Sequence, residues 1–566
     1  MTAIGIDFGT TNSVASYLSG GQTQVLNLDT PPIEWAPYGF DQVFPSIMAH
    51  TDAGLAFGWA AKQARTGRFE AVKRLFATQL DYAMDAAGDA LAVEEVATML
   101  FAEIRQRVAG QGIDATSAVI TVPANSKGRA RHRTKICAGM AGFEVLGLIN
   151  EPTAAAMAYA QKHPEARQLL VFDWGGGTLD VTVLHATQGV FIEQASSGLP
   201  TMGGLDFDSR LAKLVRQQMN SNELWSEEQK SDFRLQIELA KIRLSNDTDT
   251  TVRLPNGSSV RISRDQYEAE IRALIEEART PIERVLSDIK AGPGAFDAVV
   301  MVGGTCRIPA VRNFVRDVLG VEPDLDINPM TAVAEGAAIA AAILSGASDD
   351  YDFFVSTEHA LGTFAMDGRT KSMEFSTIIP RNHKLPAMAQ ESYSPVYEEQ
   401  ENVQIEVVEG DPDVAEPDFT VLKSWSVPLT RANGVRVNSF LLRYEWDVSG
   451  ILHVTAVDEG TGETFLEDDI SYGIAEDKKK LAQMSSRARK AVESGSLSRE
   501  SAAVVEDSEA ADMIAKARTK IIPFLDGDEA ESLLEIVGRL ESSSGDDLAN
   551  AKVDARRALA EYSYLL

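Results

Sequence analysis

The stretch IGIDFGTTN, residues 4–12, decides the fold of this chain, because an apolar run leads directly into an aspartate, a glycine and two threonines. The same order returns in VFDWGGGTLD, residues 171–180. Each stretch, with the apolar run after it, is typical of two strands joined by a tight glycine turn. Such turns let backbone N–H groups approach phosphate oxygens, and the aspartates can hold hydrated Mg²⁺. Two such hairpins, one from each half of a domain, could grip one nucleotide between them.

Length and composition set the class of protein. The 566 residues predict three or four domains, and 44% apolar with 24% charged residues is ordinary for a globular protein. The net charge of −30 argues against a nucleic-acid partner. The two cysteines, Cys137 and Cys306, are too few for a disulfide framework or a zinc site. Because the sequence shows neither a signal peptide nor an apolar run of the ~20 residues that span a membrane, we expect a cytoplasmic protein with no membrane partner.

Changes in periodicity divide the chain into four parts. Residues 1–345 mix apolar strand runs with helical stretches, as an α/β domain does. Residues 346–358 are polar and acidic with one apolar patch, which predicts an interdomain linker. Residues 359–473 alternate with period two, which predicts an antiparallel β domain. Helical spacing returns in residues 474–566.

Seven stretches match the motifs of one known family in that family's order: residues 4–12, 71–75, 118–123, 149–156, 172–180, 202–208 and 302–309. On these blocks the chain resembles the seventy-kilodalton heat-shock protein (DnaK-type) chaperone family. A single glycine-rich loop would be a weak signal, whereas seven blocks in the family's order are a strong one. The resemblance implies a duplicated actin-like (ribonuclease H-like) ATPase domain, a linker, a β-sandwich that binds peptides and an α-helical lid.

The resemblance also implies roles around a bound ATP or ADP. Asp7 and Asp173 would hold Mg²⁺ through water molecules. Lys73 would reach the γ-phosphate and the attacking water, where its charge offsets the negative charge that develops on the phosphate oxygens. Taken alone, one aspartate or lysine would be a solvated surface charge, and the joint match reverses that interpretation. The implied catalytic set is Lys73, Glu151, Asp180 and Thr178.

Further residues would contact the nucleotide itself. Glu238, Lys241 and Ser245 are spaced i, i+3, i+7, which places them on one helix face. The resemblance assigns them to the adenine, and an ordinary ion pair on a wet helix is the alternative. The nucleotide-binding set is Gly9, Thr10, Thr11, Asn12, Gly175, Gly176, Gly177, Gly203, Gly204, Glu238, Lys241, Ser245, Gly303, Gly304, Thr305 and Arg307.

Pro123 and Arg131 match a family switch pair that relays the nucleotide state to the linker. For Pro123 the alternative is simple strand termination. Arg131 lies in the basic run 127–135, which in so acidic a chain we interpret as a solvated helix face rather than a nucleic-acid patch. Cys306 lies in the loop on the adenosine side, and we expect a small buried residue rather than a redox switch.

The β domain should carry the peptide groove of the family. Such a groove holds an extended chain by backbone hydrogen bonds and takes one apolar side chain in a pocket. Because β domains always contain inward apolar residues, plain sandwich core is the alternative. The predicted groove residues are Met366, Tyr393, Val396, Val403 and Ile405.

Several positions depart from the family pattern. Gly147 stands where the family has an arginine, and Val355 stands where it has the linker aspartate that this arginine contacts. Thr363 replaces an apolar groove residue, and the segment 254–267, which carries an exposed loop in relatives that use the GrpE-type exchange factor, is short. The lid is shortened, and residues 562–566 lack an acidic tail. These features resemble specialised bacterial paralogues of the HscC type.

The leading hypothesis is an ATP-dependent molecular chaperone, an ATPase whose hydrolysis of ATP to ADP and phosphate opens and closes a groove for extended apolar polypeptide. The expected partners are an unfolded client, a dedicated J-domain co-chaperone with weak dependence on standard ones, and an exchange factor other than the GrpE type. An ATP-switched adaptor or reactivating factor for one folded client is the alternative. A metabolic kinase on the same fold is a third, against which the parts beyond residue 359 speak.

Overall fold

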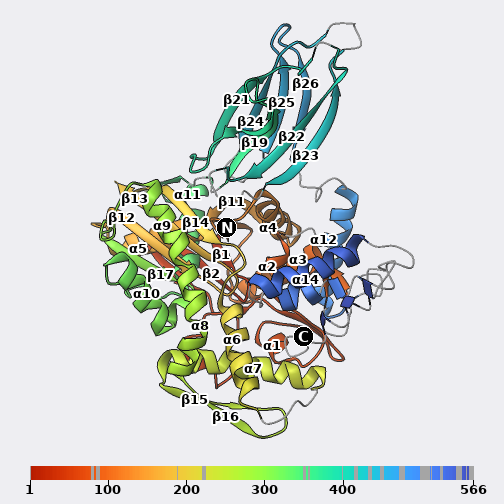
Figure 1. The fold of residues 1–566 in the computed structure, drawn as a ribbon. Helices are drawn as coiled ribbons and strands as arrows, with labels where there is room; N and C mark the ends of the chain where they lie inside the picture. The colour runs from red at the N-terminus through yellow and green to blue at the C-terminus, as the bar shows by residue number, and fades with distance from the viewer. Residues whose placement is uncertain are drawn as a thin grey trace.

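The computed structural model describes most of the chain. The described residues are 2–77, 82–84, 90–187, 189–219, 225–348, 352–354, 357, 359–397, 399–412, 419–430, 436–446, 452–470, 478–497, 510, 513–514, 516–522, 527–542, 551–552, 554–555 and 558–559. Val355 and the C-terminal stretch 562–566, both singled out in the sequence, lie outside these ranges. An α/β domain fills the lower part of Figure 1 and a β-sandwich stands above it.

Each glycine turn joins two central strands of its own sheet. The first sheet has the order β11-β10-β1-β2-β3 with β4 beside β2, and the second has the order β17-β12-β13-β14-β18. In the first sheet, β1 pairs antiparallel with β2 and parallel with β10. In the second sheet, β12 pairs antiparallel with β13 and parallel with β17. This repeated pairing agrees with the duplicated domain that the family resemblance implies. The strands are β1 (Ala3–Phe8), β2 (Asn12–Ser19), β3 (Gln22–Val25), β4 (Phe44–Pro45), β10 (Ser117–Val122), β11 (Glu144–Asn150), β12 (Gln168–Trp174), β13 (Leu179–Thr187), β14 (Val190–Leu199), β17 (Ala298–Val302) and β18 (Asp352–Phe354).

Two alanine-rich helices, α5 (Glu151–Lys162) and α11 (Ala332–Leu344), cross between the two sheets. Helix α5 packs on β12 and β13, whereas α11 packs on β1 and β2. Small side chains let them approach closely. A Cβ at Gly336 would lie 1.7 Å from the carbonyl oxygen of Ala154, so only glycine permits this crossing.

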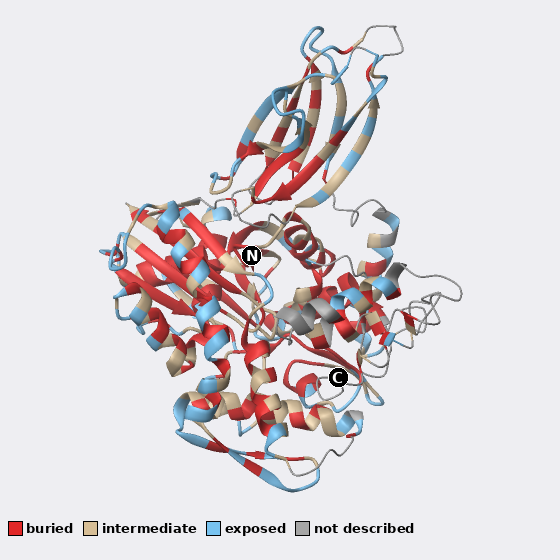
Figure 2. Cartoon of the chain, viewed as in Figure 1, coloured by how far each residue is buried: buried red, intermediate tan, exposed pale blue. Residues whose placement is uncertain are grey.

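The outer faces of both sheets are covered by helices whose apolar sides are buried (Figure 2). Helices α3 (Val93–Gly110) and α4 (Gly128–Met140) cover the first sheet. Four helices cover the second sheet: α6 (Gly204–Gln217), α8 (Arg264–Glu277), α9 (Arg279–Asp288) and α10 (Pro309–Leu319).

Each half of the domain also carries an arm. The arm of the first half contains η1 (Ala36–Tyr38), β5 (Met48–Thr51), β6 (Gly54–Phe57), α1 (Trp59–Gln63), β7 (Arg68–Phe69), α2 (Val72–Leu75), β8 (Tyr82–Met84) and β9 (Ala90–Ala92). The arm of the second half contains α7 (Glu227–Asn246), β15 (Asp249–Arg253) and β16 (Ser259–Ser263), and the turn η2 (Gly304–Arg307) follows β17. Strands β15 and β16 form a simple hairpin, so the short segment 254–267 holds only its turn, its second strand and the start of α8.

The β-sandwich consists of two four-stranded antiparallel sheets, β20-β19-β22-β23 and β21-β24-β25-β26. Its core is apolar, and the hydroxyl of Tyr444 donates a 2.9 Å hydrogen bond to the carbonyl of Gly362 on the opposite sheet. The strands are β19 (Ala360–Met366), β20 (Met373–Ile379), β21 (Ala387–Tyr393), β22 (Asn402–Gly410), β23 (Thr420–Pro428), β24 (Phe440–Trp446), β25 (Leu452–Asp458) and β26 (Thr464–Asp469).

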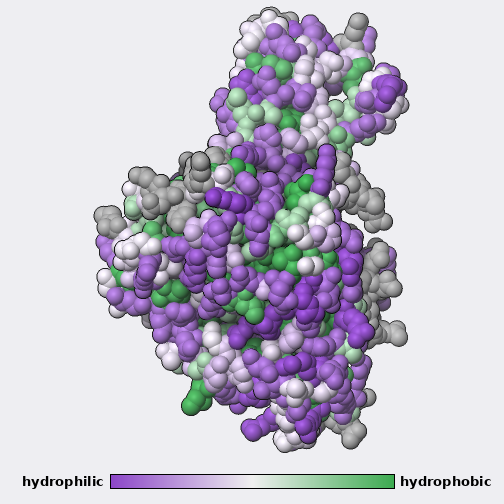
Figure 3. Space-filling view, turned by 90° about the vertical axis from the view of Figure 1, so that its left-hand side faces the viewer, coloured by the Kyte–Doolittle hydropathy of each residue, from purple (hydrophilic) through white to green (hydrophobic). Residues whose placement is uncertain are grey.

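The C-terminal part contains α12 (Lys478–Ser494), the π-helical turn η4 (Ala517–Ile521) and α14 (Gly527–Ser542). Helix α12 packs on α3, where its residues Met484 and Ala488 join the core under the first sheet. No helix in the described ranges has both the length and the hydropathy of a membrane span. The face shown in Figure 3 is mostly hydrophilic, with small separate hydrophobic patches.

Candidate nucleotide site

The two glycine turns face each other across a cleft between the halves of the α/β domain. A Cβ at Gly176 would lie 2.6 Å from the side chain of Thr11, and one at Gly177 would lie 2.7 Å from Oγ1 of Thr10. Helix α6 begins against the second turn, since the N–H of Gly204 donates to the carbonyl of Gly175 at 2.9 Å. The predicted phosphate-binding segments 9–12 and 175–178 are therefore neighbours, and the predicted nucleotide-binding residues Gly203 and Gly204 lie beside the second of them.

Four charged side chains gather beneath the turns. The ammonium of Lys73 lies 2.6 Å from Oε1 of Glu151, and about a tenth of each side chain is exposed. Asp7 lies in β1 and accepts a 3.0 Å hydrogen bond from the hydroxyl of Thr121. Asp173 lies at the corresponding place in β12 and is 6% exposed. The structure thus brings both predicted metal-binding aspartates together with two of the four predicted catalytic residues, Lys73 and Glu151.

The electrostatics of this cluster favour a cation. Burial raises the pKa of Asp7 to about 7, the charge of Glu151 adds to the rise, and Lys73 opposes it. Burial likewise raises the pKa of Asp173 well above its usual range, with Glu151 and Asp7 adding to it. Three crowded carboxylates share one ammonium, so a divalent cation would relieve the repulsion between them. This oxygen-rich donor set fits hydrated Mg²⁺.

Asp180 and Thr178 occupy different places beside the second turn. The N–H of Gly175 donates to the carbonyl of Thr178 at 3.1 Å, which closes the turn. Asp180 is completely buried, and its Oδ1 accepts a 2.9 Å hydrogen bond from the N–H of Asn125. Asp180 therefore also ties the second turn to the segment that follows Pro123.

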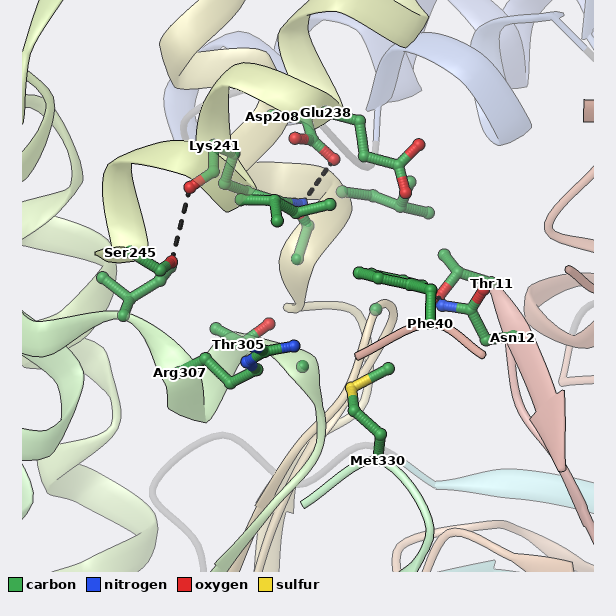
Figure 4. A pocket seen from close by; sticks show the side chains of 16 residues that line it. Thr11, Asn12, Phe40, Asp208, Glu238, Lys241, Ser245, Thr305, Arg307 and Met330 are labelled. Carbon is green, nitrogen blue, oxygen red and sulfur yellow. Dashed lines mark hydrogen bonds and ion pairs between the residues drawn. The ribbon is translucent and has the colours of Figure 1, made fainter. Parts of the chain in front are cut away.

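A pocket beside the two glycine turns is lined from both halves of the domain (Figure 4). Glu238, Lys241 and Ser245 lie on one face of α7, as their spacing predicts. The ammonium of Lys241 donates to Oδ2 of Asp208 at 2.7 Å and to the carbonyl of Gly204 at 2.8 Å. Burial raises the pKa of Asp208 to about 6, and the charge of Lys241 opposes this rise. Lys241 is thus held within the pocket wall rather than on a wet helix face.

The opposite walls complete this pocket. Thr305 and Arg307 line it from η2, and Thr305 donates a 2.8 Å hydrogen bond to the carbonyl of Gly175. Gly303 adopts φ +84°, and a Cβ there would lie 2.4 Å from the carbonyl oxygen of Trp174. Phe40 and Met330 also line the pocket. Our sequence analysis did not assign either of them, and the position of Phe40 in a loop gave no signal.

A buried ion pair joins the two arms above this pocket, and the sequence analysis missed it. The ammonium of Lys62 lies 2.6 Å from Oε1 of Glu238, with 4% of the lysine side chain exposed. The same ammonium lies 4.7 Å from the ring centroid of Trp35 and 5.5 Å from that of Trp59. Two aromatic faces and a carboxylate thus fix the lysine, and the pair closes the arms over the pocket.

Breaking this pair should speed the release of bound nucleotide. We expect Lys62→Met to raise the ADP dissociation rate about tenfold, because it removes a charged hydrogen bond from a nearly closed site. Stopped-flow release of a fluorescent ADP measures this rate. Arg65→Met is the matched control, since Arg65 and Asp232 join the same arms at 3.4 Å but are largely exposed. Equal effects of the two variants would contradict the expectation.

The predicted relay residue Arg131 is 6% exposed. Its guanidinium donates to the carbonyl of Ser126 at 3.0 Å and to Oδ1 of Asn150. Its neighbour Arg133 is completely buried and lies 2.8 Å from Oε1 of Glu94. Our interpretation of the run 127–135 as a solvated helix face is therefore wrong for residues 131–133, because α3 and the turn after Pro123 cover that face.

The predicted groove residues do not share one environment. Met366 and Val396 are 41% and 56% exposed. Tyr393 is half-buried with its hydroxyl 2.8 Å from that of Ser376, and Val403 is half-buried against the core. Ile405 is 2% exposed within the core, which agrees with the alternative of plain sandwich core. Of ten large apolar side chains that are exposed in the described residues, six lie on the sandwich: Met366, Met373, Met388, Val396, Tyr397 and Val421.

Cys306 is 3% exposed, and its Sγ lies 3.6 Å from the carbonyl of Phe172. Burial raises the pKa of its thiol above the usual range. This environment agrees with the expectation of a small buried residue.

Two facing glycine turns, a cluster of three carboxylates and one ammonium beneath them, and a β-sandwich on the same chain are the features of a multidomain nucleotide-binding protein. A family model described as "Hsp70 protein" matches residues 3–565. The chain therefore belongs to the Hsp70 family, whose members are ATPases that bind ATP and ADP, generally with Mg²⁺. This confirms the resemblance drawn from the seven blocks.

Individual relatives are similar over most of their length. A "Chaperone protein DnaK" of Thermus thermophilus is 31% identical over 542 residues, which cover 87% of this chain and 85% of the relative. A "Chaperone protein dnaK" of Cyanidioschyzon merolae is 34% identical over 505 residues, which cover 81% and 80%. A "Chaperone protein DnaK" of Deinococcus proteolyticus is 30% identical over 594 residues, which cover 95% and 93%.

Proposed function

We propose that the chain is an ATP-dependent molecular chaperone whose β-sandwich alternates between an open and a closed state for extended apolar polypeptide. ATP hydrolysis to ADP and phosphate drives the alternation. The observation that carries this proposal is the pairing of β18 with β14, in register Phe191–Phe353. Strand β14 belongs to the sheet whose β12–β13 turn would face the phosphates. The segment that leads to the sandwich is therefore paired with the second half of the α/β domain.

In the proposed open state the sandwich is docked on the α/β domain, and hydrogen bonds between the two support this arrangement. His359 lies 3.3 Å from the carbonyl of Asn125, and both carboxylate oxygens of Glu409 accept from the N–H of Gly128 at 3.3 Å. The ammonium of Lys127 donates to Thr420 at 3.0 Å. These three contacts fall on the segment directly after Pro123, to which Asp180 also bonds. A change at the phosphates can therefore reach the sandwich through this turn.

Helix α12 is also docked on the α/β domain, which agrees with the proposed open state. Its Arg487 lies 3.3 Å from the buried carboxylate of Glu95, and its Ser485 donates to the carbonyl of Met140 at 2.7 Å. Just beyond the helix, Gly495 accepts from the N–H of Leu55 at 2.7 Å. The helix is thereby held on the α/β domain. In the proposed cycle, hydrolysis releases both the helix and the sandwich, and the helix then covers the bound segment.

The chemistry of hydrolysis would fall to the residues beneath the turns. Mg²⁺ held through water by Asp7 and Asp173 would neutralise charge on the β- and γ-phosphates. Lys73 would stabilise the charge that develops on the γ-phosphate oxygens, and Glu151 would fix the ammonium of Lys73 in place. The backbone N–H groups of both turns would hold the phosphates in line.

Peptide binding in the two nucleotide states tests the proposal. We expect a labelled extended apolar peptide to dissociate from the full chain much faster in ATP than in ADP. Equal dissociation rates, or no binding in either state, would overturn the proposal. A pull-down dominated by one folded partner, without preference for extended peptide, would instead support the adaptor or reactivating factor. Stimulation by different J-domain proteins and exchange factors would then identify the co-chaperones.

A further inference from the structure

A buried carboxylate, Glu193, lies between the linker strand β18 (Asp352–Phe354) and the cluster that contains Lys73 and Glu151. Glu193 is 3% exposed and follows directly after Val190, Phe191 and Ile192, the three residues of β14 that pair with β18. The register of β14 shifts beside it, because Val183 pairs with Ala195 and Leu184 pairs with Glu193. Such a bulge re-aims neighbouring side chains. The position of β18 and the orientation of Glu193 are thus set by one short segment.

The carboxylate of Glu193 reaches across to the first half of the domain. The amide of Asn150 donates to both of its oxygens, at 3.0 and 3.1 Å, and the hydroxyl of Thr153 donates to Oε1. Asn150 is the N-cap of α5, and Glu151 is the first residue of that helix. The two donors therefore stand on either side of the residue that holds Lys73 at 2.6 Å.

Asn150 is also tied to the predicted relay. Its Oδ1 accepts from the guanidinium of Arg131, while its amide nitrogen donates to Glu193. A second contact reaches β14 from the sandwich, since Arg381 donates to the carbonyl of Ser196. Strand β14 thus receives both the linker strand and a sandwich side chain, and Glu193 is the side chain through which it holds the start of α5.

We propose that Glu193 is a positioning residue that couples the docking of the linker strand to the geometry of the Lys73–Glu151 pair. When β18 leaves β14, the segment around the bulge relaxes and Asn150 and Thr153 lose their shared acceptor. Because a buried carboxylate is stable only while its donors remain in place, the two arrangements are discrete. The inference rests on the proposed function, in which docking and hydrolysis respond to each other.

The test compares hydrolysis with and without a client in the full chain. Single-turnover ATP hydrolysis is measured for the native protein, Glu193→Val and Glu193→Gln, each with and without a reduced and carboxymethylated unfolded protein. We expect the client to change the native rate about fivefold or more and to change that of Glu193→Val less than about twofold. The affinity for ATP should stay the same, since Glu193 does not line the pocket. Glu193→Gln, which keeps one acceptor oxygen, should recover part of the response.

Control variants distinguish a loss of the response to client from a loss of folding and from a failure of the proposed function. Gln194→Ala alters an exposed residue of the same strand and should keep the full response. If Glu193→Val does not fold, an undiminished response in Glu193→Gln together with unchanged basal hydrolysis overturns the inference. A full client response in a folded Glu193→Val overturns it while leaving the proposed function intact. If hydrolysis by the native protein does not respond to client, the inference fails, whereas the proposed function fails only if peptide also dissociates equally fast in ATP and in ADP.

Discussion

Replacing Lys73 by alanine is expected to lower single-turnover ATP hydrolysis about 10²–10³-fold, the effect of removing one preorganised charge from a transition state. ATP should still bind, because in the proposed site the backbone of the turns at residues 9–12 and 175–178 would supply the phosphate contacts. The ammonium of Lys73 is the one cation among three crowded carboxylates in the described cluster. Rapid-quench hydrolysis of prebound ATP, together with calorimetric binding, measures the two quantities separately.

A lysine elsewhere in the domain provides the control for this result. Lys162→Ala removes an exposed lysine from the end of α5, the helix that begins with Glu151, and should leave hydrolysis within about twofold of the native rate. If Lys73→Ala hydrolysed prebound ATP at the native rate, Lys73 would have no part in the chemistry. If it bound no ATP, its role would lie in binding instead.

The same cluster predicts opposite pH dependences for two variants. Asp7 must be ionised to hold Mg²⁺, and its pKa is raised to about 7, so Mg²⁺-dependent ATP binding should weaken as the pH falls through that value. Lys73 lowers this pKa and Glu151 raises it. Lys73→Ala should therefore move the loss of binding to higher pH, and Glu151→Gln should move it to lower pH. Shifts in the same direction would contradict this assignment.

The parts of the site that could be predicted from sequence are those fixed by short local patterns. A strand, an aspartate, glycines and a threonine specify a phosphate turn within about ten residues, because backbone geometry dictates which residue types fit. The resemblance supplied Lys73 and Glu151, whose pairing across 78 positions has no local signal. The helical spacing of Glu238, Lys241 and Ser245 sufficed to place all three on one wall.

The parts that could not be predicted depend on contacts between distant segments. Lys62 is fixed by aromatic rings of its own arm and by Glu238 from the other half, so its role emerges only when the arms close. Counting charges made the run 127–135 look solvated, but Glu94 of α3 supplies a buried partner for Arg133. Alternation in the β domain predicts that one face is buried, but it does not separate Ile405 in the core from an exposed Met366.

Asp411→Ala is expected to undock the β-sandwich and to abolish most of the effect of ATP on peptide release. Asp411 accepts from Arg284 of α9 and lies 3.7 Å from Arg381, with only a tenth of the Asp411 and Arg381 side chains exposed. Arg381 in turn lies 2.8 Å from Asp288 of α9. Removing the shared carboxylate leaves two arginines facing each other across the interface. Truncation of such a buried charge costs about 2–5 kcal/mol, which is about 30-fold or more in the docking equilibrium.

Three variants that should differ in the size of their effect on peptide release test this expectation. Peptide release in ATP should slow toward the rate in ADP for Asp411→Ala, and scattering in ATP should show a more extended chain. Arg284→Ala should have a smaller effect, because Arg284 is 28% exposed and Arg381 keeps both acidic partners. Asp469→Ala, which removes an exposed partner of His453 on the far sheet, should have none. If Asp411→Ala released peptide in ATP as fast as the native protein, the sandwich would be held by the linker strand and the turn after Pro123 rather than by this arginine pair.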